Sequence, residues 1–204
     1  NPGTEQELFT MEELIEAFSF DHVHKAGARF DPEKARWFNE QYLRKQPDEK
    51  LAMVLKREVQ QHLQLPEADP RLSNSFLTGA VALLKERVQF GNELFEKGRY
   101  LFEAPTSLDE QVLAKKWKEE YRPFFADLTE TLKVTLPFDR TTIDTAIKTI
   151  AAKHRIKPGE IMQLLRVFIS GLGAGVDLIG MMMLMGLRHP AFIGILSSTM
   201  TRKA

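Results

Sequence analysis

The spacing of the apolar residues constrains this chain most, because it follows the period of an α-helix along almost the whole sequence. The clearest run comprises Leu51, Val54, Leu55, Val59 and Leu63. Similar runs cover residues 76–88 and 143–150. No segment alternates with the period of two that a half-buried strand shows. The pattern therefore predicts an all-α protein.

Residues that favour helix N-termini agree with this prediction. Asp31 precedes Pro32, and Ser107 lies three residues before Glu110, two arrangements that are typical of helix starts. Pro105 interrupts the helical pattern, so we expect two consecutive helical subdomains, 1–102 and 103–204. The helices are expected at about 10–18, 31–44, 48–64, 71–88, 90–101, 107–117, 119–133, 141–154, 158–170 and 176–186.

Composition excludes several classes of protein. A chain of 204 residues without cysteine can bury a core unaided, and it has no disulfide, thiolate nucleophile or cysteine-based zinc site. Cysteine usage therefore indicates a cytoplasmic protein. The 28 basic and 28 acidic side chains are unevenly spread, with 14 and 17 in residues 1–100 against 14 and 11 in residues 101–204. This asymmetry favours an anionic partner for the second half.

The longest apolar stretch, residues 167–187, predicts a loop followed by a short helix rather than a membrane span. Asp177 lies at its middle, and Gly171, Gly173 and Gly175 cluster where a spanning helix would have to continue. We expect no membrane partner. The acidic N-terminus, which lacks an initiator methionine, is typical of an interior cut rather than of a signal peptide.

No constellation predicts catalysis. The glycines of residues 170–175 do not have the spacing of a dinucleotide fingerprint, and a phosphate-binding P-loop is absent. His22 and His24 are two residues apart, which places them on different faces of a helix rather than on one metal. We therefore expect no catalytic residue and no metal site.

Two apolar features of the sequence are expected to be structural, and the second also has a functional interpretation. We expect Trp37 to lie in the core. We also expect the methionine-rich segment 181–185 to pack in the core, on the helix that contains residues 161–169. Methionine also suits adaptable binding surfaces. The alternative function is thus a helical protein–protein adaptor that docks through this segment and residues 191–196.

Several stretches together resemble bacterial glutamyl-tRNA synthetases. They are GTEQELFTMEELIEAFSF (3–20), GARFDPEK (27–34) with Trp37, Asn39, Tyr42 and Arg44, KGRYLF (97–102), and the segment 156–171. The resemblance extends to about Gly186. It implies the part of the enzyme that follows the catalytic half: a helical region that contacts the tRNA stem and a helical anticodon-binding domain.

The resemblance also implies partners and cofactors. The partner would be tRNA(Glu), not DNA, and the protein would be a monomer. The ATP-binding motifs of the family are absent from this chain, so ATP and magnesium would bind the catalytic half of the parent enzyme. We expect no cofactor here and no charging of tRNA by this chain alone.

From spacing alone, Arg87 and Arg166 are ordinary surface arginines. The resemblance implies that Arg87 reads the third anticodon base. A guanidinium only donates hydrogen bonds, so it matches the acceptors on the pairing edge of cytosine better than guanine, whose edge presents mostly donors. Glutamate anticodons end in C and glutamine anticodons in G. Arg87 would therefore favour tRNA(Glu).

The resemblance assigns the first two anticodon bases to Arg166 and the loop 172–178. The site residues of this loop would be Gly173, Gly175, Val176 and Leu178. Residues 175–177 of this loop differ from many members of the family. Asp177 would repel phosphate there unless it bonds a base amine.

The helix at residues 31–44 would approach the inner tRNA stem. Its candidate contact residues are Lys34, Asn39 and Arg44, with Lys34 and Arg44 binding phosphates without regard to sequence. The sequence after Gly186 also departs from the family pattern.

Overall fold

The structure, a computed structural model, describes residues 5–20 and 29–186. Within these two stretches every regular element is helical, which confirms the all-α prediction. No helix there is long and apolar enough to cross a membrane. The α-helices are α1 (Met11–Ala17), α2 (Pro32–Lys45), α3 (Asp48–Leu63), α4 (Asn74–Leu84), α5 (Glu93–Gly98), α6 (Glu110–Lys116), α7 (Arg122–Val134), α8 (Arg140–Lys153), α9 (Pro158–Ser170) and α10 (Leu178–Met185).

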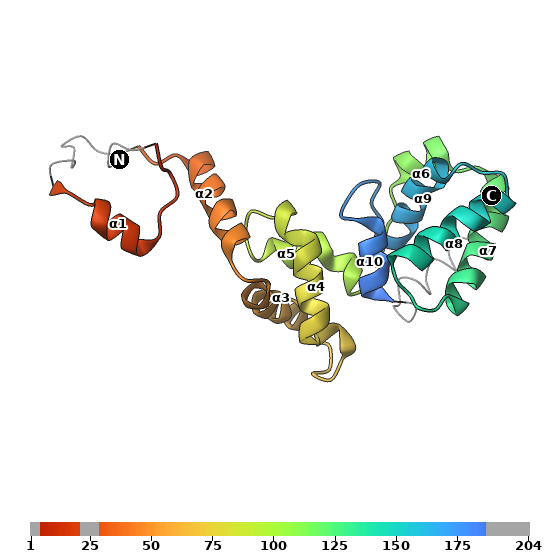
Figure 1. Ribbon diagram of the computed structural model, residues 1–204, viewed down its shortest axis with the longest axis horizontal. Coiled ribbons are helices and arrows are strands. Elements are labelled where there is room, and N and C mark those ends of the chain that lie inside the picture. Colours follow the sequence, from red (N-terminus) through yellow and green to blue (C-terminus); the bar gives the residue numbers. More distant parts are fainter. Residues whose placement is uncertain (1–4, 21–28, 187–204) are drawn as a thin grey trace.

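The helices form an elongated molecule (Figure 1). α1 and α2 lie at one end, α3 to α5 form a middle group, and α6 to α10 form a group at the other end. α3 packs on α4, α7 on α8, and α6 on α9, whereas α10 contacts both α4 and α8. α10 therefore attaches the C-terminal group to the middle group. The expected division at residue 102 stays a prediction.

Side-chain caps explain where several helices begin. The Thr10 hydroxyl and the Glu13 carboxylate form a capping box at α1, and Asp31 accepts bonds from the first turn of α2. The expected cap at Ser107 is wrong: the cap of α6 is Asp109, two residues later, whose Oδ1 accepts from the Val112 amide at 3.0 Å. A carboxylate satisfies the free amides of a first turn, so Asp109 fixes this start.

The helix expected at 71–88 is three consecutive elements. They are the 3₁₀ turn η2 (Pro70–Leu72), α4, and the 3₁₀ turn η3 (Lys85–Arg87). Ser73 separates the first two, because its hydroxyl accepts from the Phe76 amide and caps α4. Two further 3₁₀ turns are η4 (Arg99–Leu101) and η5 (Glu119–Tyr121).

The core contains most of the expected apolar stripes, with one exception. Trp37 is 38% exposed, so its expected burial is wrong; α2 buries only Leu43. Met181, Met182 and Met185 are buried, which confirms the core interpretation of this segment. Their helix packs mainly on α4 and α8 rather than on α9 as expected.

Candidate nucleic-acid interface

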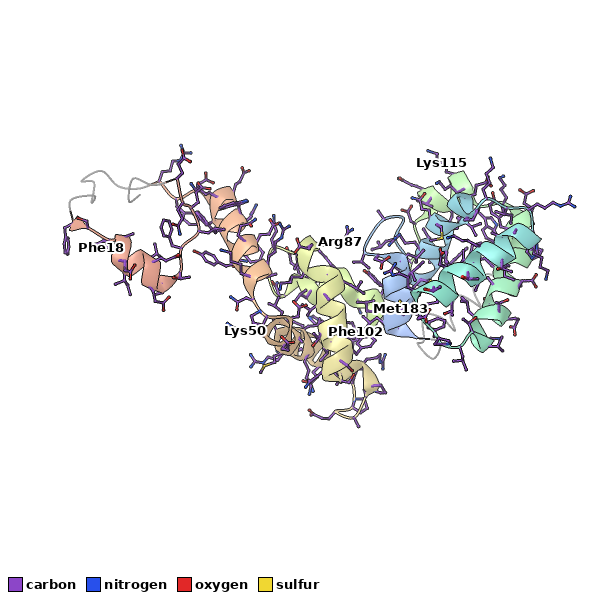
Figure 2. The ribbon with its side chains drawn as sticks, viewed as in Figure 1. Phe18, Lys50, Arg87, Phe102, Lys115 and Met183 are labelled. Atoms are coloured by element: carbon purple, nitrogen blue, oxygen red, sulfur yellow. The ribbon has the colours of Figure 1, made fainter. Side chains whose placement is uncertain are left out.

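Arg87 is the last residue of η3, and its side chain is exposed. The short turn follows α4 directly and leads into the segment that connects α4 to α5. Figure 2 shows Arg87 near the place where the middle helices meet α10. Within the part of the chain that the structure describes, its guanidinium has no ion pair or hydrogen bond. Arg87 is therefore free to bind an external acceptor.

Arg166 lies in α9 and is half-buried. Its Nη1 donates a hydrogen bond to the Val176 carbonyl, across the loop that joins α9 to α10. Burial lowers the pKa of Arg166, Arg87 lowers it further, and Tyr100 and Asp177 oppose these effects. A Cβ at Gly175 would lie 3.4 Å from Nη1, at ordinary van der Waals contact, so the guanidinium lies directly against this part of the loop.

Tyr100 is a buried tyrosine on which the charges of both arginines act. It lies in η4 and is only 7% exposed. Burial raises the pKa of its hydroxyl, while the charges of Arg166 and Arg87 act in the opposite direction. The charges of Arg87 and Arg166 thus both act on one phenol, although the two arginines come from different groups of helices.

The loop from Gly171 to Asp177 is fixed by bonds to α6 and α9. The Asp109 amide donates to the Gly171 carbonyl at 2.9 Å, and Gln163 Nε2 donates to the Gly173 carbonyl at 2.9 Å. Gly171 has a φ of 79°, a conformation that favours glycine. The structure therefore confirms that this glycine-rich segment is a loop between two helices.

The loop turns some of its expected contact residues inward. Val176 is 3% exposed and Leu178 is 4% exposed, because the first turn of α10 packs into the core. Leu172 and Ala174 are exposed instead. Any contact made at Val176 would involve its backbone, and the expected contact of Leu178 with a base stays a prediction.

The charge of Asp177 is neutralised within the protein. Its carboxylate caps α10 by accepting from the Gly180 amide at 3.0 Å, and it forms an ion pair with Arg140 of α8. The Arg140 guanidinium, followed by the amide bonds, lowers the pKa of Asp177. This pairing offsets the repulsion of phosphate that the sequence predicted.

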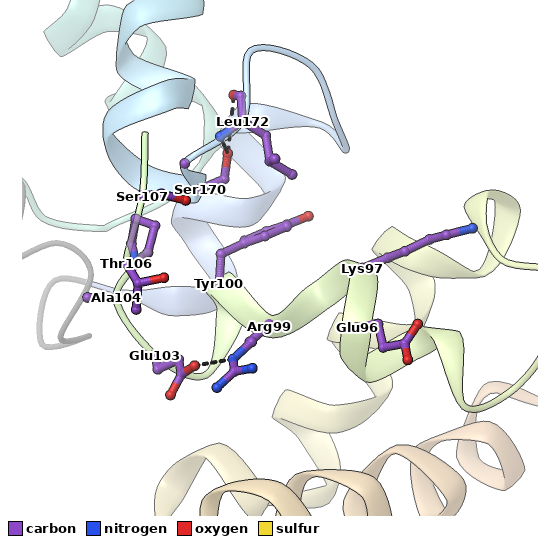
Figure 3. A pocket seen from close by; sticks show the side chains of 12 residues that line it. Glu96, Lys97, Arg99, Tyr100, Glu103, Ala104, Thr106, Ser107, Ser170 and Leu172 are labelled. Atoms are coloured by element: carbon purple, nitrogen blue, oxygen red, sulfur yellow. Dashed lines mark hydrogen bonds and ion pairs between the residues drawn. The ribbon is translucent and has the colours of Figure 1, made fainter. Parts of the chain in front are cut away.

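A groove of about 470 Å³ lies beside Tyr100, between η4 and the start of the loop. Figure 3 shows the Tyr100 ring reaching into this groove, with Lys97 on one side and Leu172 on the other. Its lining carries both signs of charge, and Arg99 forms an ion pair with Glu103. The described residues contain no cluster of three potential metal ligands.

The three expected stem residues are separated along α2. Lys34 Nζ forms an ion pair with Glu7 at 2.9 Å, and both side chains are at least half exposed. Asn39 donates to the Gln89 carbonyl. Arg44 pairs with Glu40 of its own helix and with Glu86. Asn39 and Arg44 therefore contact the segment that carries Arg87.

Residues 33–189 match the anticodon binding domain family. The chain belongs to this family. The glutamate–tRNA ligase of Cytophaga hutchinsonii is 38% identical over 187 residues, which are 91% of this chain and 35% of that protein. The ligase of Flavobacterium psychrophilum is also 38% identical, over 91% of this chain and 36% of that protein. The chain thus spans just over a third of these relatives.

Solved structures agree with this assignment. A glutamate tRNA ligase from Elizabethkingia meningosepticum in complex with its amino acid superposes with a TM-score of 0.85 at 31% identity, over 99% of this chain and 39% of that one. The glutamate–tRNA synthetase of Elizabethkingia anophelis gives 0.79 at 29% identity, over 96% and 37% of the two chains.

In this anticodon-binding domain the roles of Arg87 and Arg166 stay predictions, and no role of its own was predicted for Tyr100 from the sequence. Tyr100 is part of the KGRYLF stretch that carries the resemblance, but residue spacing does not show which charged groups act on it. The bonds of Asn39 and Arg44 to segment 86–89 were missed as well, because a side-chain bond to a distant carbonyl leaves no signal in the spacing of residues.

Proposed function

We propose that this chain is the part of a glutamate–tRNA ligase that recognises tRNA(Glu) by its anticodon and inner stem. The observation that carries the proposal is the similarity to proteins named glutamate–tRNA ligase along 91% of the chain at 38% identity. The exposed Arg87, whose guanidinium has no partner among the described residues, and Arg166, which is bonded to the loop before α10, support it.

In this proposal Arg87 donates to the third anticodon base and favours C over G. Arg166 and loop 172–178 cradle the first two bases. Bases of a single-stranded loop are read along their edges after they unstack, and a fixed glycine-rich loop lets the backbone approach them closely. Gly173, Gly175 and the backbone at Val176 would form this surface.

Affinity without sequence preference would come from phosphate contacts. Lys34 fits such a role, because among the described residues its only ion pair is with the exposed carboxylate of Glu7, and a phosphate can replace a surface partner of this kind at little cost. Arg44 and Asn39 are already bonded within the protein.

The activity of the whole protein is part of the proposal. The parent enzyme would attach glutamate to tRNA(Glu) with ATP, and ATP and magnesium would bind outside this chain. The chain itself would have no cofactor and no catalytic residue, and the protein would be cytoplasmic and monomeric.

Binding of the chain to tRNA(Glu), and to a variant whose third anticodon base is G, tests this function. At two salt concentrations, we expect tighter binding to the C form and weaker binding of both at high salt. Arg87→Gln should remove a preference worth about 1–3 kcal/mol. Arg57→Gln, which changes an exposed arginine of α3, is the matched control and should keep it. An unchanged preference in Arg87→Gln would contradict the assignment.

The adaptor alternative has no observation in its favour. Met183 is 40% exposed, but the other three methionines of this segment are buried, so they offer no apolar surface. Residues 191–196 lie outside the described residues. Apolar docking would also depend little on salt, so the same titration separates the two functions.

A further inference from the structure

Two side chains of α5, which form an ion pair with each other, hydrogen-bond to one side of the backbone segment that carries Arg87. Lys97 Nζ donates to the Arg87 carbonyl at 2.7 Å, and Glu93 Oε2 accepts from the Gln89 amide at 2.8 Å. Lys97 and Glu93 are also 3.1 Å apart, one helical turn from each other. Burial raises the pKa of Glu93, but the Gln89 amide and Lys97 hold it below its usual value. The carboxylate is therefore charged at neutral pH.

The same segment is bonded on its other side by α2. Arg44 Nη2 donates to the Glu86 carbonyl at 3.3 Å, and Asn39 Nδ2 donates to the Gln89 carbonyl. Between these bonds the Val88 side chain is 1% exposed and anchors the segment in the core. Four backbone groups of residues 86–89 thus have side-chain partners from two helices.

These four side-chain bonds to the backbone of residues 86–89 are more than the end of a helix requires. Backbone groups in an irregular segment require partners, but on a surface water can supply them. Here two helices supply them instead, while the Arg87 guanidinium is left without a partner among the described residues. Fixing the backbone before binding lowers the entropy cost of a contact and sets its geometry.

We propose that Lys97 and Glu93, together with Asn39 and Arg44, are positioning residues that hold Arg87 in place to discriminate the third anticodon base. This inference rests on the proposed function, since it requires Arg87 to read that base. It changes the expected role of Asn39 and Arg44, which the resemblance placed on the tRNA stem. The competing role for Lys97 is a direct contact with a tRNA phosphate.

The two roles have different signatures. Loss of a phosphate contact weakens binding about equally for all sequences and lowers the slope of log affinity against log salt by about 1. Loss of positioning lowers the preference for C over G and leaves the salt slope unchanged. Lys97→Met removes the ammonium but keeps most of the apolar stem, so it separates these outcomes.

The experiment measures binding of wild type and variants to the C and G forms of the tRNA at several salt concentrations. Lys97→Met should lower the ratio of the affinity for the C form to the affinity for the G form about three- to tenfold. This is part of the discrimination that one base contact supplies. Lys97→Arg retains a donor and should restore most of the ratio. The control is Lys148→Met, which breaks a surface ion pair of the same spacing on α8 and should leave both ratio and slope unchanged.

A second measurement in the free protein tests the positioning without tRNA. The Gln89 amide should exchange with solvent deuterium about tenfold or more faster in Glu93→Ala than in wild type. A wild type that ignores the third base would overturn both the proposed function and this inference. A discriminating wild type whose ratio survives Lys97→Met, or whose salt slope falls instead, would overturn the positioning role alone.

Discussion

Gly173 is packed against the first turn of α6 with no room for a side chain. A Cβ at this position would lie 2.6 Å from Val112 Cγ2 and 2.7 Å from Asp109 Oδ2. Asp109 is also the cap of α6. Because residue 173 has no side chain, the loop can lie directly against the start of α6. A larger residue would displace both the Asp109 cap and the loop.

Gly173→Ala should lower the free energy of unfolding by about 1–3 kcal/mol, the usual cost of overpacking. Gly159→Ala is the matched control, since a Cβ there meets no described atom within 4 Å. Gly159 lies in the first turn of α9, where alanine should raise the free energy of unfolding by up to about 1 kcal/mol. Urea unfolding followed by circular dichroism measures both changes. Equal effects of the two substitutions would contradict this account.

At the scale of elements, α3 ends on a residue with an unfavourable backbone conformation. Gln64 has a φ of 49°, and its amide donates to the Gln60 carbonyl to close the last turn. A left-handed residue at this position is the usual end of a helix, but glycine adopts it without the steric penalty of a side chain.

Gln64→Gly should therefore raise the free energy of unfolding by about 0.5–1 kcal/mol, after part of the gain is lost to the greater freedom of the unfolded chain. Gln61→Gly places the same substitution at an exposed position inside α3 and should lower the free energy by about 1 kcal/mol. Thermal denaturation of both variants shows whether each substitution raises or lowers the stability. If Gln64→Gly were the less stable of the pair, the left-handed cap would not be the controlling feature.

The helices could be predicted from the sequence because each one depends on local spacing. Where a prediction was wrong, the reason lies in tertiary packing or in the side chain that caps a helix. Ser73 offered no apolar signal and still divides an expected helix. Trp37 is exposed because α2 leaves the middle group and buries little. In the site, Arg87 and Arg166 could be named from the resemblance, but the side chains that bond to the backbone around Arg87 come from α2 and α5, and only the packing of the folded chain brings them there.

At the scale of the whole molecule, the net charge is zero, but interactions in the folded protein favour the ionised form of several carboxylates. Their pKa values are lowered by hydrogen bonds from the backbone and from side chains and by nearby cations on several helices. Lys153, followed by His154, lowers the pKa of Asp127, and Trp117, followed by Arg122, lowers that of Glu119. Elsewhere in residues 5–20 and 29–186, Glu93, Asp139 and Asp177 are of this kind.

These shifts predict that the protein loses stability in acid. In the unfolded chain the same carboxylates have ordinary pKa values near 4, so below about pH 5 the unfolded state binds more protons than the folded state. The stabilisation is fully present above that pH, and it is lost as the pH falls through the lowered pKa values of the folded protein. The urea midpoint should therefore decrease from about pH 5 toward pH 3.

Lys153→Met tests one contribution to this acid sensitivity. Without the ammonium, the pKa of Asp127 should rise toward its ordinary value, because Lys153 is the largest cause of its shift. The decrease of the urea midpoint in acid should then be shallower than in wild type. Lys133→Met removes the same charge from an ion pair with Glu130 of α7 and leaves the partners of Asp127 in place. A slope equally reduced in both variants would mean that net charge, rather than the pairing of Asp127, controls acid stability.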